Sequence, residues 1–132
     1  MNNRRDAIAI GLGGAVGAIC RVLLGEALPI GDGLPWATLI ANIVGAALLG
    51  ALATAPASAG RLGDLRMPLL GIGFCGGLTT FSALSWELFD LLDRGSVGAA
   101  AAYAALSLVL GMAALVVARR FVLARLEAGD SA

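Results

Sequence analysis

The sequence of 132 residues has no histidine and no lysine, and few of its residues carry a charge. Charged residues make up 14% of the chain, against about 25% in soluble domains. Without histidine, the chain lacks the commonest metal ligand and the usual proton shuttle near neutral pH. Nine basic and nine acidic residues give a formal net charge of zero, so no basic field attracts nucleic acid. We therefore expect no nucleic-acid partner.

Cysteine is also scarce, and the familiar catalytic combinations are missing. Cys20 and Cys75 both fall in apolar segments and lack the spacing of metal ligands. We expect them to be small buried hydrophobic side chains. The chain has no Ser–His–Asp set, no Cys–His pair and no phosphate-binding loop. These absences leave little for enzymatic chemistry, and we do not expect an enzyme.

Apolar residues are in excess, at 59% of the chain with a mean hydropathy of +0.91. They form four runs, separated by charged or turn-rich breaks. About 20 helical residues, rising ~1.5 Å each, cover a hydrocarbon core of ~30 Å. The predicted spans are residues 7–25, 36–55, 67–92 and 97–118. We predict an all-α membrane protein with one four-helix transmembrane domain over 1–132, surrounded by membrane lipid.

A cleavable signal peptide is the alternative interpretation of the first apolar run. Arg4 and Arg5 precede it, and small residues suitable for cleavage lie within it. The run is unusually rich in glycine, however, and Arg21 closes it. We therefore prefer a first membrane span.

The arginines indicate an orientation for the four spans. Arg94 falls alone on one side, and Arg21 lies near that end of the first span. The other seven arginines fall on the opposite side; they are Arg4, Arg5, Arg61, Arg66, Arg119, Arg120 and Arg125. The positive-inside rule then places both termini in the cytoplasm.

The third run is the most informative segment of the chain. It has no charge from residue 67 to 86, it holds four glycines within 71–77, and a group of hydroxyl side chains follows. We do not expect a sequence of this composition to form one continuous helix. A broken helix is tolerated in hydrocarbon only where protein or a water-lined cavity covers the freed backbone groups. We predict a break near the middle of the third helix, with a functional site beside it.

The other spans contain few polar side chains, and each has a structural and a functional interpretation. Arg21 could reach the interface or attract anions to a vestibule. Asn42, the only amide side chain in any span, could join two helices or line a pore with Thr38. Tyr103 and Ser107 lie one helical turn apart and could bond a backbone carbonyl or a passing ion.

Taken together, these groups suit a small anion that exchanges its water shell for hydrogen-bond donors. The donors are amide, hydroxyl and guanidinium groups, with Thr80 among the hydroxyls. Phe81 could add the positive edge of its ring. Glu87 follows Thr80 by seven residues and could face a pore mouth at the far end.

Three strings of residues resemble a known family. GGAVGAICR (13–21), ATLIANIVG (37–45) and GFCGGLTTFS (73–82) are similar to the CrcB/Fluc fluoride channels. The third string is highly specific. The resemblance spans the chain, including the four-span length and the Tyr-x-x-x-Ser pair of the last span. It implies a fluoride-specific channel of the bacterial cytoplasmic (inner) membrane, which protects the cell by passive fluoride efflux.

The resemblance also implies an assembly and a set of site residues. It implies an antiparallel dimer, one protomer inverted against the other, with two pores. A structural sodium ion at the dimer centre, which is not transported, would be bound by backbone carbonyls of Gly76 and Thr79. The resemblance implies that Arg21 is the vestibule arginine. We add Glu87 to the vestibule. The implied pore residues, to which we add Thr80, are Asn42, Phe81, Tyr103, Ser107 and Thr38.

Two departures from the family pattern leave open whether the dimer consists of identical or different subunits. Leu84 stands where the family usually has a second pore phenylalanine, and it offers no ring edge to an anion. The arginine bias resembles that of one half of a heterodimer, whereas homodimers with both orientations have almost none. We expect a heterodimer with an oppositely oriented paralogous subunit, with an inverted homodimer as the alternative.

Two other functions remain as alternatives. A small four-span proton-coupled exporter needs a carboxylate within the membrane, but the first span has no acid before Glu26. A non-conducting structural subunit of a heterodimeric channel would show no flux in any pairing.

Overall fold

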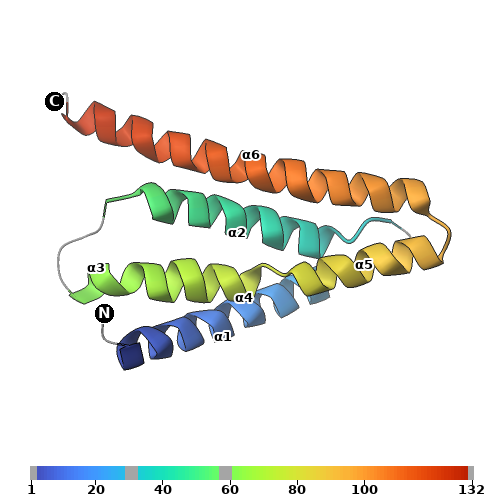
Figure 1. Cartoon of the computed structure of the whole chain (residues 1–132), viewed down its shortest axis with the longest axis horizontal. Helices are drawn as coiled ribbons and strands as arrows, with labels where there is room; N and C mark the ends of the chain where they lie inside the picture. Colours follow the sequence, from blue (N-terminus) through green and yellow to red (C-terminus); the bar gives the residue numbers. More distant parts are fainter. Residues whose placement is uncertain (1–2, 29–32, 57–60, 131–132) are drawn as a thin grey trace.

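The computed structural model describes residues 3–28, 33–56 and 61–130, with their side chains except at 3, 61, 62 and 130. Within these ranges the chain is helical and has no strand (Figure 1). The elements, in chain order, are α1 (Asn3–Ala27), α2 (Trp36–Thr54), α3 (Arg61–Arg66), the π-helical segment η1 (Met67–Cys75), α4 (Gly76–Leu78), α5 (Phe81–Asp93) and α6 (Val97–Asp130).

Four stretches of this described part are long and apolar enough to cross a membrane. They are Arg4–Ala27, Trp36–Thr54, Gly63–Asp93 and Val97–Gly129. The predicted all-α membrane protein with four spans is confirmed. The last helix extends beyond the predicted span 97–118, because residues 119–130 are mostly good helix formers.

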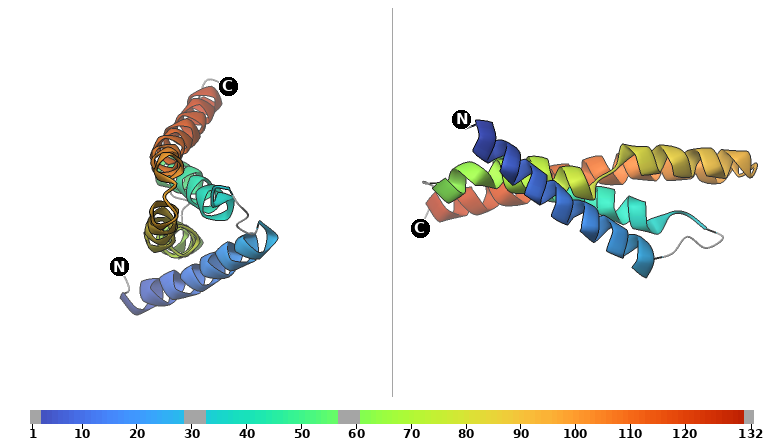
Figure 2. Two further views of the ribbon diagram at one scale, coloured as in Figure 1. Left: turned by 90° about the vertical axis from the view of Figure 1, so that its right-hand side faces the viewer. Right: turned by 90° about the horizontal axis from the view of Figure 1, so that it is seen from below.

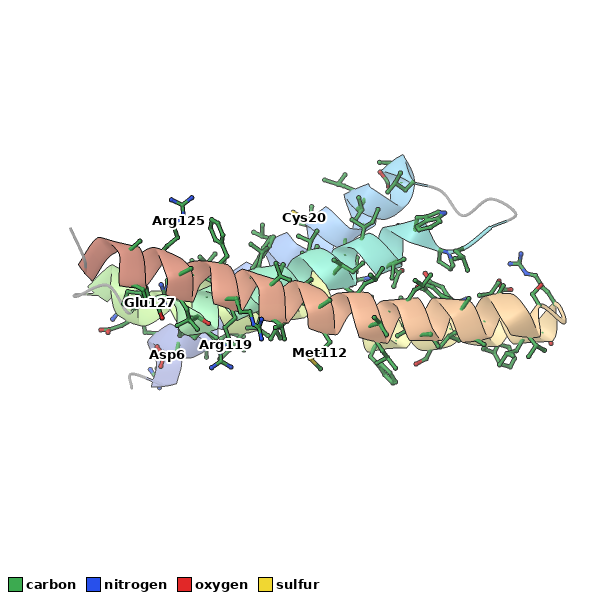
Figure 3. The ribbon with its side chains drawn as sticks, turned by 90° about the horizontal axis from the view of Figure 1, so that it is seen from above. Asp6, Cys20, Met112, Arg119, Arg125 and Glu127 are labelled. Carbon is green, nitrogen blue, oxygen red and sulfur yellow. The ribbon has the colours of Figure 1, made fainter. Side chains whose placement is uncertain are left out.

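The helices alternate in direction, so both termini lie at the same end of the molecule (Figure 1). α2 lies alongside α6, with which it shares its most extensive contact. α1 packs mainly on η1 and α4, which belong to the third span, and it crosses that span obliquely (Figure 2). Figure 3 shows Asp6, Arg119, Arg125 and Glu127 towards the end that carries the termini.

The third span is broken, as predicted. The break lies at Thr79 and Thr80. Their backbones are extended, with φ −79° and ψ 152° at Thr79 and φ −151° and ψ 126° at Thr80. Two glycines before the break serve packing on α1. An added Cβ would lie 2.7 Å from the Ile10 carbonyl oxygen at Gly73 and 2.1 Å from the Gly14 carbonyl oxygen at Gly77, so glycine allows this close approach. The break therefore follows the glycine-rich segment instead of interrupting it.

Arg66 fixes the start of the third span against the end of α2. Its guanidinium donates to the carbonyl oxygens of Leu52 at 2.9 Å, Ala55 at 2.6 Å and Pro56 at 3.2 Å. These carbonyls lie at a helix C-terminus, where a positive charge is favourable. Arg66 therefore joins α2 to α3 on either side of residues 57–60.

The buried core is small and lies towards the end opposite the termini. It consists of Leu39, Leu91, Ala100 and Tyr103, and the Tyr103 side chain is completely inaccessible. α1 and α6, in contrast, expose many large apolar side chains. Apolar surface of this extent must be covered by lipid or by another protein chain.

Candidate functional site

Asn42 on α2 pairs with the backbone at the break of the third span. The Thr80 amide donates to Asn42 Oδ1 at 2.8 Å, and Asn42 Nδ2 donates to the Thr80 carbonyl oxygen at 3.2 Å. Breaking a helix frees backbone groups that need partners, and this side chain supplies both partners at Thr80. The amide carries two N–H donors, so one remains for another acceptor.

The hydroxyl groups at the break also satisfy backbone groups. Thr80 caps α5, because its Oγ1 accepts from the Ala83 amide at 3.1 Å, and it lies 3.0 Å from Ser82 Oγ. Thr79 Oγ1 donates to the Cys75 carbonyl oxygen at 2.9 Å. The hydroxyls of Thr79 and Thr80 are thus held in place by the local backbone.

A depression of about 280 Å³ lies beside the break; we call it the Asn42 hollow. It is lined by Asn42, Thr79, Thr80, Phe81, Leu84, Ser107 and Gly111. Among the described residues, Ser107 Oγ is the only buried side-chain polar atom without a hydrogen-bond partner. Phe81 is 81% exposed, so its ring borders a depression that this chain leaves open. The structure thus brings together Asn42, Thr80, Phe81 and Ser107.

The other predicted polar residues meet at the Glu87 carboxylate. Thr38 Oγ1 on α2 donates to Glu87 Oε1 at 2.6 Å, and Tyr103 Oη on α6 donates to Glu87 Oε2 at 2.5 Å. Hydrogen bonds to an ionised acceptor are short and strong. This three-residue cluster joins α2, α5 and α6, and it uses the hydroxyl hydrogens of Thr38 and Tyr103.

Arg21 lies in a second depression, of about 240 Å³, which we call the Arg21 hollow. It is lined by Arg21, Val22, Gly25, Leu28, Ala37, Thr38 and Glu87. Arg21 Nε donates to the Gly77 carbonyl oxygen at 3.3 Å, near the C-terminal end of α4. A positive charge is favourable at that end of a helix. The predicted vestibule residues Arg21 and Glu87 therefore share one hollow.

The predicted sodium ligands are the carbonyls of Gly76 and Thr79, at the end of the first half of the broken helix. In an unbroken helix the Thr80 amide would donate to the Gly76 carbonyl, but it donates to Asn42. Thr79 is extended, so its carbonyl also leaves the helical pattern. Gly76 itself is helical, so the loss of its donor and the extended backbone of Thr79 are what distinguish these two carbonyls from those of an ordinary helix.

Sequence reasoning missed the role of Gly45, one helical turn from Asn42 on α2. A Cβ at Gly45 would lie 2.2 Å from Thr79 Cγ2, so glycine makes room for the Thr79 side chain. It also missed that Ser107 lines the Asn42 hollow, whereas Tyr103, one turn away, is fully buried and donates to Glu87. Their spacing shows a shared helix face, but the partners on α2 and α5 decide the environment of each.

Four apolar spans, one of them broken, with polar side chains gathered beside the break, define a small multi-pass membrane protein. A sequence profile described as "CrcB-like protein, Camphor Resistance (CrcB)" matches residues 8–119, and the chain belongs to this family. The resemblance seen in the three sequence strings is confirmed.

Several named relatives are similar over most of the chain. A Mycobacterium bovis protein named fluoride-specific ion channel FluC 1 is 42% identical over 112 residues, which are 84% of this chain and 85% of the relative. A protein of the same name from Mycolicibacterium paratuberculosis is 41% identical over 120 residues, or 89% and 90% of the two chains. A FluC protein from Phenylobacterium zucineum is 45% identical over 111 residues, or 82% and 87%.

Proposed function

We propose that this chain is a subunit of a fluoride-specific channel in the bacterial cytoplasmic membrane, through which fluoride leaves the cell down its gradient. The relatives named for this activity match more than four fifths of the chain. The observation that carries the proposal is the buried, unpaired Ser107 hydroxyl in the Asn42 hollow. Burying a donor without a partner costs about 1–3 kcal/mol, so such a group is expected where a ligand binds.

The Asn42 hollow offers the donors that a dehydrating anion needs. Ser107 supplies an O–H group, Asn42 its second N–H group, and Phe81 the positive edge of its ring. These groups would replace water around fluoride as it passes. Phe81 is highly exposed, which leaves that side of the pathway for a second chain to close.

Charge at the Arg21 hollow would control access to the pathway. The Arg21 guanidinium raises the local concentration of anions. Glu87 carries the opposite charge, but Thr38 and Tyr103 donate to both of its carboxylate oxygens. These bonds hold the carboxylate against α2 and α6, and Arg21 is the one cationic side chain among the residues that line this hollow.

The second chain would be an oppositely oriented paralogous subunit in an inverted dimer. Six arginines with described side chains lie on the side of the termini, and the Arg61 side chain is outside the described set; the six are Arg4, Arg5, Arg66, Arg119, Arg120 and Arg125. The positive-inside rule gives such a chain one orientation, with cytoplasmic termini. Leu84 lines the Asn42 hollow without a ring edge, which favours a partner that supplies the second aromatic wall.

A structural sodium ion at the dimer centre would be bound by the carbonyls of Gly76 and Thr79. The support is the diversion of the Thr80 amide to Asn42, which removes the helical donor of the Gly76 carbonyl. Replacing sodium by N-methylglucamine should dissociate the dimer or stop the flux, as read by light scattering and a fluoride electrode. If neither changes, the two carbonyls are not a sodium site.

The decisive experiment measures fluoride efflux from proteoliposomes with a fluoride electrode. The chain is reconstituted alone and with a paralogous subunit, and chloride efflux is measured in parallel. We expect fluoride efflux without chloride efflux, and a loss of about tenfold in Ser107→Ala because one anion donor is removed. Ser96→Ala, in the exposed turn before α6, is the matched control. Equal passage of chloride would exclude the selective channel.

The same assay separates the alternatives. Efflux that requires a proton gradient would indicate a proton-coupled exporter. Absence of fluoride efflux in every pairing, with a partner that conducts alone, would indicate a non-conducting structural subunit. A chain that conducts alone, with a C-terminal reporter on both sides of the membrane, would indicate an inverted homodimer.

A further inference from the structure

We propose that the groove between the start of α1 and the start of the third span binds an anionic phospholipid. This groove has a volume of about 510 Å³ and shares no lining residue with either hollow. It is lined by Arg4, Arg5, Ile8, Ala9, Leu12, Leu65 and Leu69. The inference concerns the lipid surroundings of the protein and does not depend on fluoride conduction.

The groove arises from the oblique crossing of α1 over the third span (Figure 2). The two helices touch closely at Gly13, where an added Cβ would lie 2.0 Å from the Leu69 carbonyl oxygen. N-terminal to this contact the helices diverge, with Leu65 and Leu69 forming one wall and Ile8 and Leu12 the other. A space therefore opens towards the arginine end of α1.

The lining changes from charged to apolar along the groove. Arg4 and Arg5 stand at one end, and Leu12 is eight residues further, which is about 12 Å along a helix. Ile8 and Leu12 are 64% and 62% exposed and belong to the first membrane span. Their side of the groove thus faces hydrocarbon while the arginines reach the headgroup region. A phospholipid has the same order of chemistry over this distance.

The charge of the groove selects an anionic headgroup. Its lining carries two guanidinium groups and no carboxylate. Asp6 belongs to the same first turn but does not line the groove. Arginines beside a membrane surface attract anionic lipids through their positive charge. Soluble phosphate would be attracted by the positive charge but would gain nothing from the apolar walls.

The test is native mass spectrometry of the full-length protein released from neutral-detergent micelles. Dioleoylphosphatidylglycerol and dioleoylphosphatidylcholine are titrated in parallel, and bound lipid is counted on monomer and dimer peaks. The groove variant is Arg4→Gln with Arg5→Gln. The matched control, Arg120→Gln with Arg125→Gln, removes two charges from the same end outside the groove. Because binding is measured in micelles, altered membrane orientation does not affect it.

We expect wild type and the control pair to prefer phosphatidylglycerol, and the groove variant to lose that preference by about tenfold or more. Arg4→Lys with Arg5→Lys keeps the charge and should retain most of the binding. Glycerol 3-phosphate should not displace the lipid.

Five results would overturn the proposal. The first four are equal losses in the two glutamine pairs, unchanged binding in the groove variant, loss in the lysine pair, and displacement by glycerol 3-phosphate. A fifth is phosphatidylglycerol on the monomer peak alone, which would show that a second copy of the chain covers the groove.

Discussion

The Asn42 hollow and the Arg21 hollow are built from similar polar side chains, but they differ in how their donors are used. At the Arg21 hollow, Glu87 accepts from Thr38, which also lines the hollow, and from the fully buried Tyr103. In the Asn42 hollow, the Ser107 hydroxyl has no partner within the described chain. The difference shows which donors the protein has already satisfied and which it leaves available to a ligand.

The cause lies in which acceptors the third span presents to each hollow. α5 places the Glu87 carboxylate between α2 and α6, and its two oxygens accept one hydroxyl from each. At the break, the backbone of Thr80 bonds the Asn42 side chain. No acceptor among the described residues bonds the Ser107 hydroxyl on α6. One hollow therefore holds helices together, and the other keeps a donor available.

The largest effect is expected where one residue serves both structure and transport. Asn42→Asp keeps an acceptor for the Thr80 amide but faces the Thr80 carbonyl with a carboxylate oxygen. It also adds negative charge to the Asn42 hollow. We expect fluoride efflux from proteoliposomes to fall by about 100-fold or more, because a poorly paired buried charge costs several kcal/mol. Wild-type efflux in this variant would remove Asn42 from the pathway.

A smaller effect, on stability, should mark the Arg21 hollow. Glu87→Gln removes the charge that accepts from Thr38 and Tyr103. We expect the free energy of unfolding to fall by about 2 kcal/mol, since hydrogen bonds to charged groups contribute about 1.5–3 kcal/mol each. Unfolding in mixed micelles by added dodecyl sulfate measures it, with the exposed Glu26→Gln as control.

The cluster of Thr38, Glu87 and Tyr103 also predicts that the losses of stability from two substitutions do not add. Tyr103→Phe combined with Glu87→Gln should cost less than the sum of the two single changes, because both remove the same bond. Strictly additive losses would mean that Tyr103 and Glu87 act independently, and the contrast between the hollows would then weaken.

The sequence predicted the spans and the break better than it predicted the use of each polar group. Hydropathy alone places four spans, because the bilayer fixes their length. The break was expected from the glycines at 71–77, yet it lies at Thr79 and Thr80 because close packing on α1 uses glycines of that segment. Local composition signals a special segment but not which residue leaves the helix.

The pairing across helices was beyond sequence reasoning. The spacing of Thr38 and Asn42 puts them on one face of α2, but Thr38 meets Glu87 and Asn42 meets Thr80. Those partners depend on the rotation of α2 against α5, which packing of many side chains determines. The sequence therefore predicted the set of polar residues and left open which donors stay available.

The smallest expected effect tests the contrast most directly. Ser107 and Tyr103 lie one turn apart on α6, so they form a matched pair in the same helix. Ser107→Ala removes a hydroxyl without a partner, so the free energy of unfolding should not fall, because an unsatisfied buried donor is lost. Tyr103→Phe breaks a 2.5 Å bond to Glu87, and it should cost about 1.5 kcal/mol or more.

Both variants can be measured by the same dodecyl sulfate titration, beside fluoride efflux. We expect Ser107→Ala to lose efflux with its stability intact, which would separate a transport donor from a structural one. If Ser107→Ala instead destabilises the protein as much as Tyr103→Phe, then Ser107 has a protein partner in the assembled channel. The two hollows would then be equally satisfied, and the Asn42 hollow would no longer stand out as the place where an anion finds a free donor.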